Sequence, residues 1–153
     1  MKFPADPSSL REFLRGMLRT QRLAGLGTSG PEGPHCSLVA FAEADDLKTL
    51  LFATSRATGK YSHIMRDPRV SVLIDTRTNT AEDFRDAAAV TAVGTAAEAT
   101  GPERDRFAAV YLEKHPELAD FIGAPECGVM KVSVATYRVV TRFEQVSVLP
   151  AGD

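Results

Sequence analysis

A series of short apolar segments separated by turn residues constrains the fold of this chain more than any other feature. Branched and apolar residues gather in seven segments that we expect to be strands, at residues 23–28, 35–43, 49–54, 70–76, 88–98, 128–134 and 137–148. Glycine and proline between Ser29 and Pro34 predict a hairpin between the first two strands, and Asp45 and Asp46 predict the next turn. Many short strands with few helices favour a small barrel, because closure removes exposed strand edges.

Three helices are predicted beside these strands. Ser9 and Glu12 have the spacing of a capping box, and the apolar residues that follow Ser9 recur at helical intervals. This first helix is amphipathic, so we expect it to act as a lid on the barrel. The other two helices are predicted at residues 60–66 and 102–115, and each ends close to a proline. The apolar face of the last helix is expected to contain Phe107, Val110, Tyr111 and Leu118.

Length and composition indicate a globular protein. A chain of 153 residues predicts one domain, residues 1–153, of the α+β class, mainly β with flanking helices. No apolar run is long enough to cross a bilayer, and the first seven residues lack the apolar core of a secretory signal. We therefore expect a cytoplasmic protein that does not use a membrane. The net charge of −2 gives no general attraction to nucleic acid.

The cysteines and histidines match no catalytic or metal-binding pattern. Cys36 and Cys127 are far apart in the sequence, and His35, His63 and His115 lack metal-ligand spacing. We therefore expect neither a disulfide nor a bound metal. The glycine-rich signatures of nucleoside triphosphate and dinucleotide sites are missing, and no nucleophile elbow is present.

The most informative stretch is the loop between the third predicted strand and the helix at residues 60–66. The first turn of a helix offers unpaired N–H groups and a partial positive charge, which suit a phosphate group. The loop residues whose chemistry suits an anion are Thr54, Ser55, Arg56, Thr58, Gly59 and Lys60. A second interpretation stays open, in which the hydroxyls cap the helix and the two cations are solvated.

Four segments in a fixed order resemble one known family. They are residues 26–28, residues 33–39, residues 51–56 with Lys60, and residues 67–73. Their order and spacing are similar to those of the pyridoxamine phosphate oxidase-like family of FMN-binding split β-barrels. In the second half of the chain, residues 93–96 and 111–116 look more like the branch of that family related to haem-utilisation proteins. The resemblance covers residues 10 to 148.

This resemblance implies a homodimeric split β-barrel that holds FMN in a groove shared by its two subunits. It implies that the loop after the third strand binds the phosphate and that the second strand runs beneath the isoalloxazine ring. Carried over by position, the cofactor-binding residues are Ser37, Leu38, Val39, Ala40, Ala53, Thr54, Ser55, Arg56, Thr58, Gly59 and Lys60. The sequence names no catalytic residue.

Departures from the family pattern argue against pyridoxamine phosphate as the substrate. Ala42 stands where the oxidase has a substrate-contacting lysine, Ala89 where it has a flavin-contacting glutamine, and Ser37 where it has an arginine. We therefore expect an FMN-dependent oxidoreductase that acts on another small molecule, with the flavin doing the redox chemistry. Two alternatives stay open: a protein that binds flavin or haem without turnover, and a deazaflavin-dependent reductase.

Overall fold

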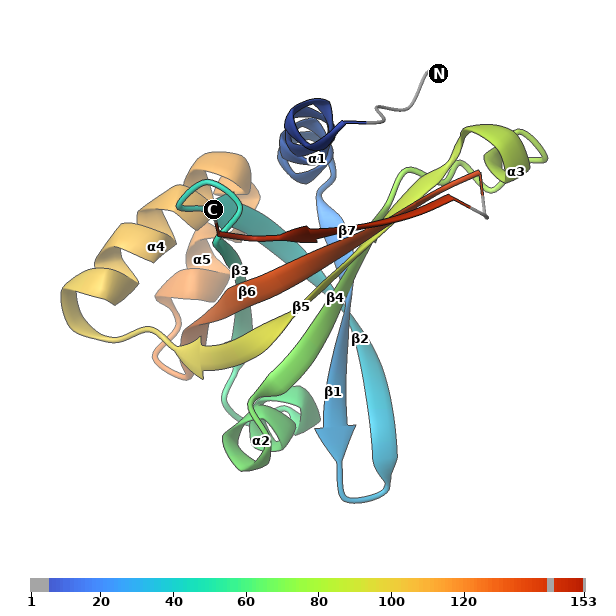
Figure 1. Ribbon diagram of the computed structural model, residues 1–153. Helices are drawn as coiled ribbons and strands as arrows, with labels where there is room; N and C mark the ends of the chain where they lie inside the picture. The colour runs from blue at the N-terminus through green and yellow to red at the C-terminus, as the bar shows by residue number, and fades with distance from the viewer. Residues whose placement is uncertain (1–5, 143–144, 153) are drawn as a thin grey trace.

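The computed structural model describes residues 6–142 and 145–152, and its strands form a closed barrel (Figure 1). The strands are β1 Leu23–Gly30, β2 Gly33–Ala44, β3 Thr49–Ser55, β4 Arg69–Asp75, β5 Ala88–Glu98, β6 Cys127–Thr141 and β7 Gln145–Pro150. The helices are α1 Pro7–Thr20, α2 Gly59–Arg66, α3 Asp83–Asp86, α4 Gly101–Lys114, the 3₁₀ turn η1 Pro116–Leu118 and α5 Ala119–Gly123. Six antiparallel strands follow one another in the order β3-β2-β1-β4-β5-β6, and β6 pairs back with β3 to close the barrel.

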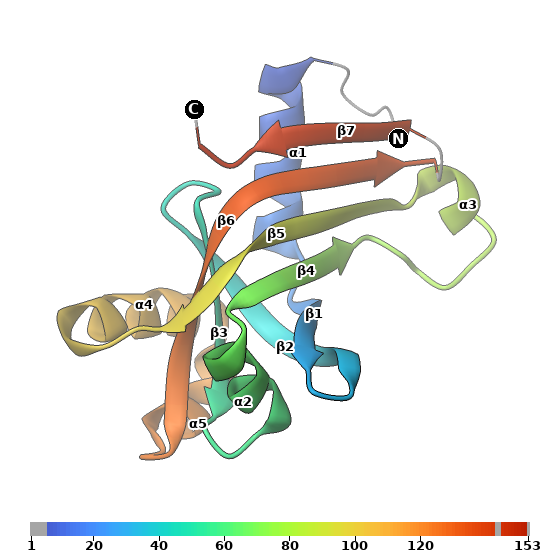
Figure 2. The same cartoon turned by 60° about the horizontal axis from the view of Figure 1, so that its bottom comes forward.

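The predicted barrel with flanking helices is therefore confirmed. Strand β7 lies outside the closed ring, paired with β6 alone among the described strands. Helices α1 and α2 lie at opposite ends of the barrel, and α4 and α5 lie together on one side of it (Figures 1 and 2). The β1–β2 hairpin is also confirmed, since Gly30 and Gly33 form its last pair around a two-residue loop.

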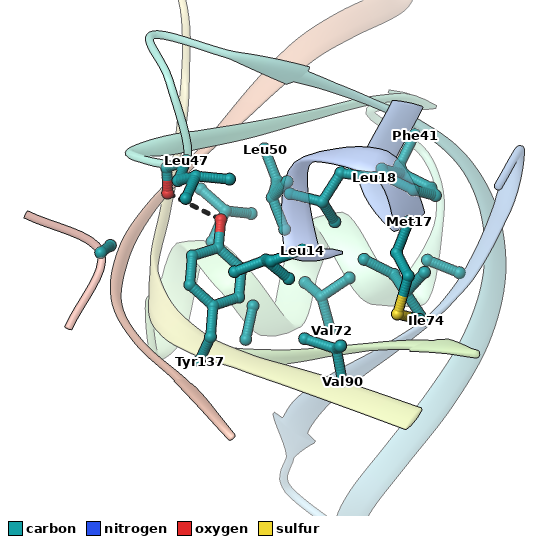
Figure 3. Close-up of a cluster of buried hydrophobic side chains, with 14 of the residues drawn as sticks. Leu14, Met17, Leu18, Phe41, Leu47, Leu50, Val72, Ile74, Val90 and Tyr137 are labelled. Carbon is teal, nitrogen blue, oxygen red and sulfur yellow. Dashed lines mark hydrogen bonds between the residues drawn. The ribbon is translucent and has the colours of Figure 1, made fainter. Parts of the chain in front are cut away.

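Helix α1 closes the barrel interior, as its amphipathic pattern predicts. Its side chains Leu14, Met17 and Leu18 are buried and point among the inward residues of the strands, which include Val72 and Val90 (Figure 3). Full burial of one such aliphatic side chain contributes about 1.5–3 kcal/mol to the free energy of folding. The lid is therefore part of the hydrophobic core.

A buried tyrosine fixes the turn between β2 and β3. Asp45, Asp46 and Leu47 all have left-handed backbone conformations, with φ values of 54°, 47° and 71°. The hydroxyl of Tyr137 donates a hydrogen bond to the Leu47 carbonyl at 2.7 Å (Figure 3). Without this donor, the Leu47 carbonyl would lose its partner in a buried setting, which is costly.

A second hydrophobic cluster lies outside the barrel, between the sheet and the helices α4 and α5. Phe107, Tyr111 and Ile122 pack there with Leu51 of β3 and Val129 of β6. Strand β3 is consequently buried on both faces, which explains why its sequence is a continuous apolar run without alternation.

The sequence prediction was wrong about the cap of the first helix, about three short elements and about the place of Leu118. Asp6 caps α1 in place of Ser9: its carboxylate accepts a hydrogen bond from the Ser9 amide at 3.0 Å, because the helix already begins at Pro7. Glu12 instead pairs with Arg15 at 2.6 Å. The short elements α3, η1 and α5 were not predicted, and Leu118 belongs to η1 and not to the preceding helix.

The last two predicted strands were divided at the wrong place. Residues 127–141 form one continuous strand, because β6 pairs with β3 from Cys127 to Ser133 and with β5 from Met130 to Thr141. The register of this pairing shifts between Val93 and Gly94, where Ala135 of β6 is an extra, unpaired residue, and a Cβ on Gly94 would clash with the Ser133 carbonyl oxygen. The chain then turns at Arg142 and returns as β7; residues 143 and 144 of the predicted strand lie outside the described residues. None of the helices in the described part of the chain is long and apolar enough to span a membrane.

Candidate functional site

A hollow of about 300 Å³ lies where β2 and β3 approach the start of α2 and the helices α4 and α5. Eight of the predicted cofactor-binding residues line it: Leu38, Val39, Ala40, Ala53, Thr54, Ser55, Thr58 and Lys60. Three further side chains complete it: Tyr111, Leu118 and Phe121. The volume is at the lower end of the range for small-molecule sites in proteins.

The loop from Thr54 to Lys60 forms one side of this hollow and is held by its own hydrogen bonds. The Ser55 carbonyl accepts from the Thr58 amide at 3.3 Å and from the Thr58 hydroxyl at 3.0 Å. The Ser55 hydroxyl accepts from the Ala57 amide at 3.2 Å, and the Thr54 and Thr58 hydroxyls lie 2.9 Å apart. These bonds give the loop a defined shape before any ligand arrives.

Part of the helix-capping interpretation holds for this loop. Thr58 is the N-cap of α2, and its hydroxyl accepts from the Tyr61 amide at 3.4 Å. Thr54 is only 1% exposed, and its hydroxyl is already bonded within the loop. The hydroxyls of Thr54 and Thr58 therefore shape the loop, and the groups left for an anion are the Ser55 hydroxyl, the backbone amides and the cations.

Lys60 is the cation that faces the hollow. It is half-buried, and within the described residues no hydrogen bond or ion pair involves its ammonium group. Gly59 and Lys60 are the first two residues of α2, so their N–H groups have no acceptor inside the helix. The start of α2 thus combines a cation with unpaired donors, which is the chemistry that binds a phosphate group.

Arg56, the other predicted cation, does not line the hollow. Its guanidinium forms a bidentate pair with Glu98, at 2.7 Å for the Nη2 contact, and donates to the Pro125 carbonyl at 2.9 Å. This pairing holds the pKa of Glu98 below its usual value, although burial of the carboxylate acts in the opposite direction. Arg56 is therefore engaged with a carboxylate near the loop and not with the hollow.

Two other predicted residues also lie outside the lining. Ser37 pairs with Leu26, a residue that points into the barrel, so the Ser37 side chain shares the inner face of β2 and not the outer face of Leu38. Gly59 lies on the other side of the loop, beside His63. All the cofactor contacts assigned from the sequence stay predictions, and Ser37, Arg56 and Gly59 do not line this hollow.

The lining from α4, η1 and α5 was not predicted as part of the site. Tyr111 donates its hydroxyl to the Ala40 carbonyl at 3.1 Å, and burial raises the pKa of Tyr111 to about 12. The tyrosine thus ties α4 to β2 at the floor of the hollow. Its helical spacing predicted only that it packs against the sheet, because a sequence does not show which strand a helix covers.

A larger hollow of about 660 Å³ lies near α3, between the β4–β5 connection and the outer face of β4, β5 and β6. Its charged groups are already paired: Asp75 contacts Arg77 at 3.0 Å, and Asp83 accepts hydrogen bonds from the Thr78 and Asn79 amides. Two carboxylates and one guanidinium line this hollow, so its net charge is negative and it does not suit a phosphate group.

The histidines lie away from the hollow beside α2. His115 is buried, with its Nε2 2.6 Å from the Phe41 carbonyl oxygen. The Nδ1 of His63 lies 2.9 Å from the Thr28 hydroxyl, and the His35 ring packs edge-on against the His63 ring. No histidine is therefore available as an axial ligand inside this hollow.

The comparison with known families agrees with this arrangement. The sequence model of the pyridoxamine 5'-phosphate oxidase family matches residues 10–143, which is most of the chain. The chain belongs to this family. Among curated proteins, none matches the sequence.

Several solved structures share the fold. A haem-binding protein from Mycobacterium smegmatis superposes with a TM-score of 0.82 at 20% identity over 92% of this chain, which spans just 57% of that protein. General Stress Protein 26 from Bacillus anthracis gives 0.68 at 20% identity, over 92% of this chain and 98% of that one. A related protein of the pyridoxinephosphate oxidase family from Clostridium acetobutylicum gives 0.74 at 13% identity, over 95% and 96%. At these identities the likeness shows the fold alone.

Proposed function

We propose that the protein binds FMN, with the phosphate at the loop before α2 and the flavin ring along the outer face of β2. One observation supports this most strongly: Lys60 lines a hollow whose other wall is the outer side of β2 and β3, and it lies in the first turn of α2, where N–H groups have no acceptor within the helix. A phosphate dianion needs both charge and N–H donors, and this loop supplies both.

The outer face of β2 suits a flat aromatic ring. Leu38 is 70% exposed, and it pairs with Gly25, which has no side chain, so a planar group can approach the strands closely. Backbone groups at the Leu38–Ala40 stretch can bond the polar edge of the ring. The fit of the site to FMN is therefore good at both ends of the molecule.

The same outer face supports a homodimer. Leu38, Gly25 and Leu73 lie side by side on β2, β1 and β4, and Leu73 is 42% exposed. An exposed apolar row on a strand is costly in water, and a second copy of the chain would cover it. A flavin seated on Leu38 would then lie at the edge of the dimer interface.

Within this proposal the protein is an oxidoreductase that acts on a small molecule other than pyridoxamine phosphate. Bound FMN supplies hydride or electron transfer, and the protein binds and orients it. The described residues of the hollow include the Tyr111 hydroxyl, but it is bonded to a backbone carbonyl and so is not placed as an acid or base. The choice of redox substrate therefore depends on which small molecules can approach the flavin ring.

The test is the absorption spectrum and reactivity of the protein purified from its own source. Bound FMN that is bleached by NAD(P)H and reoxidised by air supports the proposal. Flavin that stays oxidised with every donor supports a binding protein without turnover, and deazaflavin fluorescence supports a deazaflavin-dependent reductase. A haem Soret band without flavin contradicts the proposal, and it would agree with the haem-binding relative from Mycobacterium smegmatis.

A further inference from the structure

We infer that Glu98, at the end of β5, is a positioning residue that fixes the anion-binding loop from both of its ends. This inference rests on the proposed FMN site. Glu98 lies 42 residues from Arg56 in sequence and does not line the hollow. It acts on the phosphate through the residues that it holds.

The first contact of Glu98 anchors the start of the loop. Both carboxylate oxygens lie 3.1 Å from Nε of Arg56, and Oε2 also accepts from Nη2 at 2.7 Å. The same guanidinium reaches the Pro125 carbonyl, and the Arg56 amide donates to the Glu126 carbonyl at 3.0 Å. Arg56 is thereby fixed by both its backbone and its side chain.

The second contact anchors the end of the loop. The hydroxyl of Tyr61, in the first turn of α2, donates to Oε1 of Glu98 at 2.7 Å. The four residues between the two anchors, 57–60, include the amides of Gly59 and Lys60 and the Lys60 side chain. One carboxylate therefore sets the distance between the two ends of the segment that faces the phosphate.

The surroundings of Glu98 keep this arrangement in one place. The Glu98 side chain is only 16% exposed. A Cβ on Gly128 would meet the Glu98 carboxyl carbon at 3.2 Å, so glycine at this position leaves the room that the carboxylate occupies. Because Glu98 also neutralises Arg56, the net positive charge of the loop comes from Lys60.

A loop that already has its bound shape binds an anion more tightly than a mobile loop, because a mobile loop loses conformational entropy when it becomes ordered on binding. Loss of the carboxylate should therefore weaken the phosphate contact and leave the ring contact on β2 unchanged. FMN and riboflavin differ only in the phosphate, so the ratio of their dissociation constants isolates that contact.

The experiment measures FMN and riboflavin binding by fluorescence titration for the wild type, Glu98→Gln and Tyr61→Phe. The matched control is Glu103→Gln. Glu103 pairs with Lys131 at a distance of 2.6 Å, and neither residue lines the hollow. We expect the preference for FMN over riboflavin to fall about tenfold in Glu98→Gln, the loss typical of one charge-assisted contact. Tyr61→Phe should lower it less, and Glu103→Gln should leave it unchanged.

The outcomes separate this inference from the proposed function. A wild-type protein that binds FMN no better than riboflavin contradicts the phosphate site, and the role of Glu98 fails with it. A wild-type preference that is kept in both Glu98→Gln and Tyr61→Phe contradicts the inference alone. Equal weakening of FMN and riboflavin also contradicts it, since that is the effect of a merely structural residue. Tighter FMN binding in Glu98→Gln contradicts it too, because Glu98 would then be holding Arg56 away from the phosphate.

Discussion

Two cations lie four residues apart, Arg56 in the loop before α2 and Lys60 in the first turn of α2, yet their surroundings differ. Arg56 is paired with Glu98 and with a backbone carbonyl, whereas Lys60 faces the hollow beside the first amides of the helix. The sequence places both in one short stretch and offers no means to separate them, because the partner of Arg56 comes from β5. At the level of single residues, the candidate site therefore depends on Lys60.

The free energy of unfolding at acid pH tests the Arg56–Glu98 pair. The pKa of Glu98 is lowered in the folded protein, so the pair stabilises the folded state above the ordinary glutamate pKa of 4.5 and loses that contribution as the pH falls through the lowered value. Urea unfolding from about pH 7 to about pH 3 should show a smaller loss of stability in Glu98→Gln than in the wild type. Identical pH profiles would show that the pair adds nothing to folding.

At the scale of helices and strands, the sequence predicted the elements whose positions depend on residues close together in the chain. Apolar runs between turn residues located the first five strands to within about two residues, and the apolar spacing after Ser9 located α1. The continuity of β6 was not predictable, because it depends on pairing with β3 and β5, which are distant in sequence. Helix α5 was missed because five residues are too few for a helical period to show.

Helix α1 provides the clearest test of an element. Leu14 is fully buried among core side chains, so Leu14→Ala should leave a cavity and lower the free energy of unfolding by about 2–5 kcal/mol. Arg19→Ala, on the exposed side of the same helix, should change it by less than about 0.5 kcal/mol. Chemical denaturation of both variants measures the difference, and a similar small effect in both would mean that α1 is not part of the core.

At the scale of the whole molecule, the hollow beside α2 joins segments that are far apart in sequence. The sequence predicted its β2, β3 and loop residues, since these lie in two short stretches with readable chemistry. It did not predict Tyr111, Phe121 or Glu98, because their positions depend on how α4, α5 and β5 pack on the barrel. The sequence therefore predicted the residues of the hollow that lie close together in the chain, but not those that tertiary packing brings to it.

The proposed homodimer predicts the mass of the protein in solution. Sedimentation at micromolar concentration should give twice the 16.5 kDa chain mass. Leu73→Glu places a charge in the exposed apolar row on the outer face and should shift the protein toward monomer, because an unpaired charge in an interface is costly. Glu103→Gln, on α4, should stay dimeric. A wild-type monomer that still binds FMN tightly would contradict a cofactor site shared between subunits.

The central claim is that the loop before α2 binds the phosphate of FMN, and the affinity of the Lys60→Ala variant tests it most directly. Removal of the ammonium leaves the phosphate under-neutralised, so FMN affinity should fall by about 1.5–3 kcal/mol, or roughly 10- to 150-fold. The control is Lys48→Ala, at the opposite end of β3, which should bind FMN like the wild type. Flavin titration by fluorescence quenching in one buffer measures all three proteins. A Lys60→Ala variant with wild-type affinity would contradict the account, because the loop would then be an ordinary helix start and any ligand would bind elsewhere.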